Sequence, residues 1–400
     1  MDFDHIIIGS GLSALAVAAG LGGKRRILVL QGGSENTTFH YENAPAVPAS
    51  HGGAGGLGNF WHGVIPTGKS AALPGVSDSD FAALFERFYP AANIREKLGK
   101  PLLFVPGNPI RPGVEWTRLN AERETKVSFL PHDARRIRLL GGDVTVETLH
   151  GGHKAQVVWL CAGALGTPLL AAASFGPGLA RASADDHVIS YLGMAGASAG
   201  RTDIAPRAER VEGGMWLTYR LHEASQSLVT FRPARFDFAE LDRGFEKRAV
   251  FGLPAKTIIG RLLKGPSAGL ISEALFNKFG LFPKAGAYSA YAQTLVKNAY
   301  ALNLETAALS ANHKQIRAAT DLARGMAGIE GLQASRRPDL FLPGIHLHNT
   351  IDMAAAASAG LGGPQSPVQF ADASVLADIG PEHHSFKMMV AAFAKAKAFA

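Results

Sequence analysis

The amino-acid sequence predicts an α/β fold, α+β overall, with parallel-sheet units at both ends of the chain. Two strand–helix units carry this prediction, one at residues 4–21 and one at residues 155–174. In each unit, an apolar run of strand length leads through glycine into a run of helical length that is rich in alanine and leucine. A third observation is a middle region with strand-like pieces, which predicts a second, mainly antiparallel sheet.

The first unit has the pattern of a dinucleotide-binding turn and predicts a Rossmann-like domain of the three-layer ββα type. Gly9 allows a tight turn, Gly11 lets the backbone approach a pyrophosphate, and Ala14 lets the helix pack close to the strand. The positive N-terminus of that helix would face the phosphates. A second strand, residues 27–30, ends about twenty residues past the glycines, where a ribose-binding acid is expected. Gln31 stands there, polar but uncharged.

A glycine-rich loop follows at residues 51–63. So many glycines disfavour a helix or a strand, but they let backbone N–H groups approach a flat or anionic ligand. Gly55 and Gly56 are the candidates for that approach, and His62 follows Trp61 close behind. A flexible linker rarely carries a residue as bulky as Trp61, so we interpret the loop as part of a binding site.

The elements after this loop are predicted from local patterns. Residues 77–88 are expected to form a helix, because Ser77 can cap its N-terminus and apolar residues recur at helical spacing. Residues 101–116 are rich in proline and are expected to be irregular. Three short β-branched or apolar runs predict strands at residues 127–130, 136–140 and 144–148.

The second strand–helix unit begins with a buried strand that ends at Ala162-Gly163. Thr167 is expected to cap a helix whose first residue is Pro168. As in the first unit, the N-terminus of a helix would then point toward a site near the end of a strand. Cys161, inside the strand, is interpreted as a small core residue and not as a nucleophile, since free cysteine is usually buried.

Composition restricts the class of protein. The chain of 400 residues is long enough for one large domain or two entwined ones, and 47% hydrophobic residues supply a sizeable core. A single cysteine excludes a disulfide framework and a multi-cysteine metal site, so no metal site is predicted. The net charge of +7 is compatible with anionic partners, but no motif for RNA or DNA binding appears, and nucleic acid is not expected.

No signal peptide precedes the first strand and no apolar run is long enough to span a bilayer, so a cytoplasmic location is expected. Two stretches, residues 255–264 and 275–282, combine basic and apolar residues. A weak contact with a membrane surface is one interpretation of them. An ordinary surface helix is the favoured one, because Pro266 and several glycines interrupt the pattern.

Taken together as an ordered set, the motifs resemble the glucose–methanol–choline (GMC) oxidoreductase family. The resemblance covers both ends of the chain and fades between about residues 190 and 343. It is carried by Gly9-x-Gly11-x-x-Ala14, Gly55-Gly56 with Trp61-x-Gly63, residues 161–174, Asp186-His187, residues 346–353 with His346 and Thr350, residues 370–376 with Asp372 and Ser374, and His383-His384.

The resemblance implies an FAD-dependent enzyme that oxidises an alcohol group of a small molecule, with a sugar or another polyol-like alcohol expected. It implies a discontinuous FAD-binding domain of residues 1–70, 125–190 and 340–400, and a substrate-binding domain of residues 71–124 and 191–339. Because no second GxGxxG occurs, a separate NAD(P)H domain is not expected. The alternatives are a non-redox relative, such as a lyase or a flavin-dependent decarboxylase, and a non-catalytic FAD-binding partner in a biosynthetic complex. The electron acceptor and the oligomeric state stay open.

By the same resemblance, a pair of histidines performs the acid–base chemistry. His346 is the candidate base, because it stands four residues before Thr350 as in the family motif. A histidine near neutral pKa is suited to accept the hydroxyl proton. His348 is the second choice. His383 or His384 would be the other member of the pair, and the sequence does not decide between them.

The expected FAD-binding residues come from the same motifs. Val127 would lie on the adenine side, and Asp372 near the pyrophosphate or ribityl side. His62 would lie near the isoalloxazine edge, although its register does not match the family's covalent attachment site. The full expected set is Gly9, Gly11, Ala14, Gln31, Gly55, Gly56, His62, Val127, Ala162, Gly163 and Asp372.

Overall fold

A computed structural model of the chain describes thirteen segments of it. They are residues 2–32, 39–42, 44–61, 63–68, 76–140, 143–195, 208–222, 224–233, 288–326, 332–334, 341–377, 379–382 and 384–400. His62, His383 and the two basic stretches at 255–264 and 275–282 lie outside these residues. In the segments that are described, no helix is long and apolar enough to cross a membrane.

The first sheet contains the N-terminal strand and is parallel at its centre. Its order is β7 (Ser128–Leu130), β2 (Ile27–Leu30), β1 (Phe3–Ile8), β10 (Gly151–Leu160), β9 (Asp143–Thr148) and β8 (Arg136–Leu140), with β20 (Val368–Phe370) also on β10. The first half of β10 pairs antiparallel with β9, whereas its last three residues pair parallel with β20. The carboxyl ends of β1, β2, β7, β10 and β20 therefore meet at one edge.

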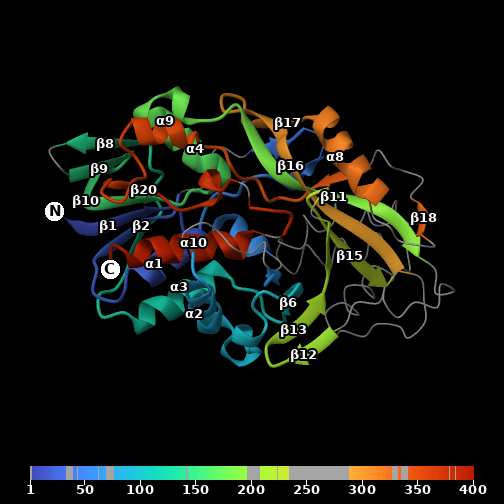
Figure 1. Cartoon of the computed structure of the whole chain (residues 1–400). Coiled ribbons are helices and arrows are strands. Elements are labelled where there is room, and N and C mark those ends of the chain that lie inside the picture. Colours follow the sequence, from blue (N-terminus) through green and yellow to red (C-terminus); the bar gives the residue numbers. More distant parts are fainter. Residues whose placement is uncertain are drawn as a thin grey trace, which may run out of the picture.

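Side chains of this sheet alternate between two apolar layers. Ile7, Val29 and Trp159 face one layer, which contains α1 (Leu12–Gly20), α2 (Asp78–Phe88), α3 (Pro112–Glu122) and α10 (Ser385–Lys397). Their sequence neighbours face the other layer, with α4 (Gly163–Phe175) and α9 (Met353–Ser358). Figure 1 shows α1 and α10 side by side across the sheet, with both chain ends near β1.

The second sheet is mainly antiparallel and is built on two long strands, β11 (Ser183–Ala195) and β16 (Tyr288–Asn303), which pair along most of their length. Helix α8 (His313–Met326) packs against β16. The other strands of this sheet are β3 (His40–Tyr41), β4 (Ala44–Pro48), β14 (Arg220–His222), β15 (Ser227–Pro233), β17 (Ala308–Ala311), β18 (Leu332–Ala334) and β19 (Phe341–Pro343). Figure 1 places this sheet at the opposite end of the molecule from the termini.

A smaller antiparallel sheet has the order β12 (Ala208–Val211), β13 (Gly214–Thr218), β6 (Leu102–Pro106) and β5 (Ile65–Pro66). Single 3₁₀ turns occur at Gly56–Phe60, Pro90–Ala92, Ile94–Glu96, Pro177–Leu179 and Ala373–Val375. The predicted α/β fold, with a parallel unit and an antiparallel one, is confirmed. The domain boundaries given above stay a prediction.

Two local predictions were wrong. Residues 101–116 are not irregular: they form β6 and the start of α3, in which Pro112 lies in the first turn. Strand β6 pairs with β5 and with β13, whose sequence is more than a hundred residues away, so no local pattern indicates it. Helix α4 begins at Gly163, and both Thr167 and Pro168 lie inside it.

Gly9 provides the first testable prediction, because its backbone is left-handed at φ +102° and is in close contact with the end of β10. A Cβ atom on Gly9 would lie 2.2 Å from the carbonyl oxygen of Cys161. Gly22, at φ +71°, has open space around the same position. We expect Gly22→Ala to cost only the backbone strain of about 1–2 kcal/mol, and Gly9→Ala to cost about 1–3 kcal/mol more through overpacking.

The free energy of unfolding from urea titration measures both. Equal losses for the two variants would show that the contact between Gly9 and Cys161 is not tight.

Candidate functional site

The glycine-rich loop and the first turn of the chain lie against each other. The backbone N–H of Gly55 donates to Ser10 Oγ at 2.8 Å, and Trp116 Nε1 donates to the carbonyl oxygen of Ser10 at the same distance. Gly55 and Gly56 both have positive φ, at 83° and 53°. A buried serine that the sequence pattern did not single out therefore holds the two predicted glycine motifs together.

The N-termini of α1 and α10 have no side-chain cap. Gly11 precedes α1 and His384 precedes α10, neither of these two residues caps its helix with a side-chain hydrogen bond, and the first turn of each helix, described in full, has no acidic residue. Such N–H groups, with the positive end of the helix dipole, favour an anionic ligand. Ala14 is fully buried where α1 packs on the sheet.

Asp372 joins the end of β20 to the start of α4. Its carboxylate accepts hydrogen bonds from the N–H of Gly163 at 2.8 Å, the N–H of Ser374 at 3.0 Å and the hydroxyl of Thr167. Burial raises the pKa of this carboxyl group, although the hydrogen bonds oppose the shift. Ala162, one residue before Gly163, is exposed at the same edge.

Two of the expected cofactor residues lie at different ends of neighbouring strands. Gln31 directly follows β2, and its N–H donates to the carbonyl oxygen of Leu130 at 3.1 Å. Val127 precedes β7 and is buried, and its N–H donates to Asn120 Oδ1 at 2.8 Å. Because β2 and β7 are parallel, Val127 lies at the amino edge of the sheet, away from Gly9 and Gln31.

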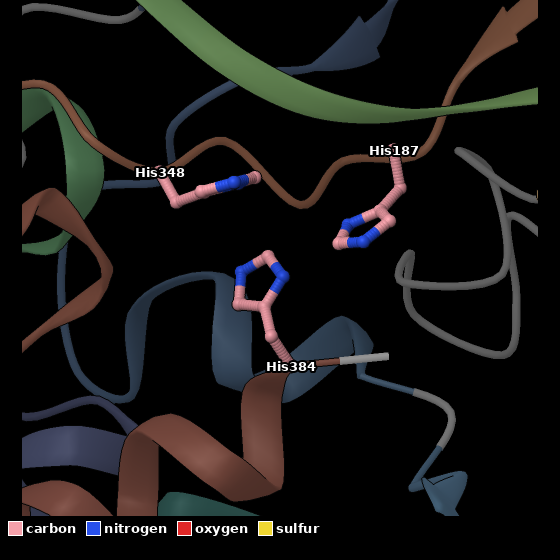
Figure 2. Close-up of side chains that lie close together, drawn as sticks. All are labelled: His187, His348 and His384. Atoms are coloured by element: carbon pink, nitrogen blue, oxygen red, sulfur yellow. The ribbon is translucent and has the colours of Figure 1, made fainter. Parts of the chain in front are cut away.

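Four histidine rings gather near the carboxyl edge of the sheet, where the segment that carries His348 bonds the residues after β20. His384 lies with its ring centroid 5.1 Å from that of His346, 4.9 Å from that of His348 and 5.3 Å from that of His187. Three of the rings are almost completely buried, whereas His346 is half-buried. Figure 2 shows His187, His348 and His384 directed from three separate segments toward a common centre.

A buried carboxylate sets the relative position of the segments that carry His187 and His346. Asp186 Oδ1 accepts the backbone N–H of each at 2.8 Å. Burial raises the pKa of Asp186 to about 7, and the backbone N–H groups partly oppose that shift. Gly344 lies so close that an added Cβ would be 1.8 Å from the carbonyl oxygen of His187.

Hydrogen bonds to carbonyl oxygens fix the tautomers of two rings. His187 Nε2 lies 2.8 Å from the carbonyl oxygen of Gly380, and His348 Nδ1 lies 2.8 Å from that of His346. A carbonyl oxygen only accepts, so these nitrogens carry the hydrogens, and the lone pairs are on His187 Nδ1 and His348 Nε2. Burial lowers the pKa of His384 well below its usual range, and the three neighbouring histidines lower it further.

The segment before α10 is fixed by a buried ion pair. Lys387 Nζ lies 3.0 Å from Glu382 Oε2, both side chains are fully buried, and Tyr219 donates its hydroxyl to Glu382. Lys387 also donates to the carbonyl oxygen of Ile379 at 3.1 Å. Because the bond from His187 reaches Gly380 in the same segment, this ion pair contributes to the position of His384.

Thr350 compensates for the proline inside α4. Pro168 has no N–H to donate to the carbonyl oxygen of Ala164, four residues earlier. The hydroxyl of Thr350 donates to that oxygen instead. This contact connects the predicted His346–Thr350 motif to α4, and the N–H of Thr350 also donates to the carbonyl oxygen of Ser374 at 2.7 Å.

Comparison with known proteins gives structural neighbours. No protein-family model matches the chain, and no curated protein matches its sequence. A fungal aryl-alcohol oxidase is 13% identical with a TM-score of 0.54, and the match covers 100% of this chain and 98% of that one. Two variants of the Aspergillus oryzae RIB40 formate oxidase with a substituted arginine, studied for FAD modification, are 12% and 14% identical, each with a TM-score of 0.50. Each match covers 99% of this chain and 97% of the oxidase chain. The similarity shows a shared fold.

The site contains residues that sequence reasoning did not commit to. The Asp186-His187 pair belongs to the family resemblance but predicts no role for His187, and His348 is only the second choice for the base. Glu382 and Lys387 flank the two consecutive histidines, and their opposite charges on either side of that pair are the signal that would have found them. Ser10 and Tyr219 have no comparable signal. Cys161 is buried, as predicted.

The ion pair of Lys387 and Glu382 gives a second prediction. Removal of one partner leaves an uncompensated buried charge, so Lys387→Met and Glu382→Leu are each expected to destabilise the protein by about 3–5 kcal/mol. The double variant is expected to lose much less than the sum of the two. The free energy of unfolding of the four proteins forms the double-mutant cycle.

The matched control is Lys397 with Asp80, a second ion pair of α10, at 2.7 Å, in which the lysine is half exposed. Its coupling is expected to be below about 1 kcal/mol. Additive losses for Lys387 and Glu382 would contradict the interpretation that the pair acts as a unit.

Proposed function

We propose that this chain is an FAD-dependent oxidoreductase of the GMC type that oxidises the CH–OH group of a small polyol-like alcohol. The observation that carries the proposal is the convergence of buried imidazoles with two uncapped helix N-termini and the glycine motifs. The fold shared with an aryl-alcohol oxidase and a formate oxidase supports it. We propose the FAD-binding and substrate-binding domains with the boundaries given above.

The residues present fit the cofactor. The residue that precedes α1, Gly11, has no side chain to accept from the N–H groups of that helix. Gly163 has φ +82° with open space where a Cβ would lie, so backbone is accessible to a ligand there. Gly9, Gly11, Gly55 and Gly56 with Ala14 would hold the pyrophosphate. Gln31, Ala162, Gly163 and Asp372 would hold the remaining parts of the dinucleotide. When bound, FAD supplies the acceptor for the hydride that leaves the alcohol carbon.

In this proposal His346 takes the hydroxyl proton of the alcohol on a ring nitrogen, and His384 holds the substrate oxygen. Burial keeps the imidazole of His384 neutral, so it can donate one hydrogen bond without a charge. His348 is the alternative base, since its tautomer leaves a lone pair on Nε2. The Nε2–H bond of His187 to Gly380 fixes the loop on which His384 lies.

The third prediction tests the base. The purified protein is expected to carry noncovalent FAD, whose absorbance bleaches when a substrate alcohol is added without oxygen. His346→Ala is expected to slow that reduction by about 10²–10⁴, because positioned proton transfer is lost. The matched control is His313→Ala, an exposed histidine at the start of α8, which is expected to change nothing. Stopped-flow absorbance measures the rates.

If His348→Ala slows flavin reduction strongly and His346→Ala slows it only slightly, the base is His348. If no alcohol reduces the bound flavin of the unmodified protein, the oxidoreductase proposal fails, and the lyase and non-catalytic alternatives take its place.

The fourth prediction concerns Gln31. A carboxylate accepts a charge-assisted hydrogen bond from a ribose hydroxyl, which is stronger than a neutral bond by about 1 kcal/mol. Gln31→Glu is therefore expected to tighten FAD binding by about fivefold. Fluorescence titration of the apoprotein measures the dissociation constant. Gln315→Glu, an exposed position on α8, makes the same charge change elsewhere and is expected to leave it unaltered. Equal or weaker binding by Gln31→Glu would mean that Gln31 does not contact the ribose.

A further inference from the structure

Three of the four histidines converge on one point, whereas a base and its partner need only two. His187, His348 and His384 are all buried, and each offers one ring nitrogen within 4.8 Å of those of the other two. They come from β11, from the segment between β19 and α9, and from the residue before α10. Figure 2 shows the three rings around one centre. Such convergence of imidazoles from distant segments is characteristic of metal sites.

The hydrogen bonds behind the rings match those of metal-binding histidines. A ligating histidine usually donates its other ring N–H to a carbonyl or carboxylate oxygen, which fixes its tautomer and orientation. His187 does so through Nε2 to Gly380, and His348 does so through Nδ1 to His346, both at 2.8 Å. The nitrogens that carry the lone pairs are therefore fixed by the protein before any ion binds.

We propose that His187, His348 and His384 form a binding site for a divalent transition-metal ion of the zinc class. Neutral imidazole nitrogens suit zinc, whereas magnesium and calcium require oxygen ligands, which this group does not offer. Three protein ligands leave a fourth position open for water or another small molecule, as in catalytic zinc sites.

The site has to contract when it binds the ion. Zn–N bonds of about 2.0–2.1 Å place tetrahedral ligand nitrogens about 3.3 Å apart. The three nitrogens, within 4.8 Å of one another, therefore move closer by up to about 1.5 Å, which rotation about the side-chain torsions supplies.

This inference does not depend on the proposed oxidation of an alcohol. It concerns only the binding of a metal ion by ring nitrogens, so its test measures metal binding and not catalysis. A failure of alcohol oxidation leaves the metal site unaffected, and a failure to bind zinc leaves the proposed oxidation unaffected.

The test uses the full chain as purified, with whatever flavin it carries, after dialysis against a chelator. Zinc is added and its binding is measured by calorimetry and by metal analysis after gel filtration, with magnesium as the ion that is not expected to bind. We expect one zinc per chain at micromolar affinity or tighter. X-ray absorption at the zinc edge is expected to show a shell of nitrogen ligands with imidazole scattering, a readout that needs no variant.

Two variants and a control locate the site. His187→Ala and His348→Ala are each expected to weaken zinc binding by more than about 100-fold, since loss even of an outer-shell partner costs 10–100-fold. Circular dichroism shows whether each variant is folded. The control is His150→Ala, because His150 lies in a separate surface group with His132, their ring centroids 4.3 Å apart, and is expected to bind zinc as the unmodified chain does.

The proposal is overturned if the unmodified chain binds no zinc, or if the absorption spectrum shows an oxygen-only shell. It is also overturned if His150→Ala removes the zinc while a folded His187→Ala retains it, since the ion would then sit at the surface.

Discussion

The structure depends on close backbone packing where β1 ends beside β10. The N–H of Cys161 donates to the carbonyl oxygen of Ile8 at 2.9 Å, and Gly9 lies so near Cys161 that no side chain fits between them. The same edge continues into β20, where the N–H of Ala371 donates to the carbonyl oxygen of Leu160 at 3.1 Å. Three chain segments from the beginning, middle and end of the sequence therefore leave the sheet at one place.

Buried carboxylates connect the chain segments that follow the strands at that edge. Asp372 binds N–H groups of α4 and of its own turn, Asp186 binds the N–H groups of His187 and His346, and Glu382 pairs with Lys387. A carboxylate without such partners would be costly to bury, so each one constrains the segments that it contacts. These contacts help to set the relative position of the half-buried ring of His346 and of the buried rings around it.

Four imidazoles in one place have a common electrostatic consequence. To protonate His384 would put a charge in a buried position beside three other rings, and its pKa falls accordingly. His384 is therefore a neutral ring, and carbonyl oxygens bond one ring nitrogen each of His187 and His348. Ring lone pairs can accept a proton from a substrate or bind a cation, and the proposed base is His346 whereas the proposed metal ligands are His187, His348 and His384. The proposed base and the proposed metal site are two uses of this one property.

Local patterns in the sequence determined the fold class, the first strand–helix unit, the capped helix at residues 77–88 and the buried state of Cys161. These predictions succeeded because a glycine turn, a helix N-cap and a periodic pattern of apolar residues depend on residues that are close in sequence. The resemblance to the GMC family indicated His346 as a candidate, with His348 as second choice, and it left His383 and His384 undecided. Only the tertiary structure decided that His187 and His348 join them, that Ser10 holds the glycine loop, and that Thr350 bonds Ala164 in place of the missing N–H of Pro168. These contacts join backbone atoms to residues far away in sequence, and every residue has a carbonyl oxygen and nearly every one an N–H, so residue type carries no record of which of them will meet.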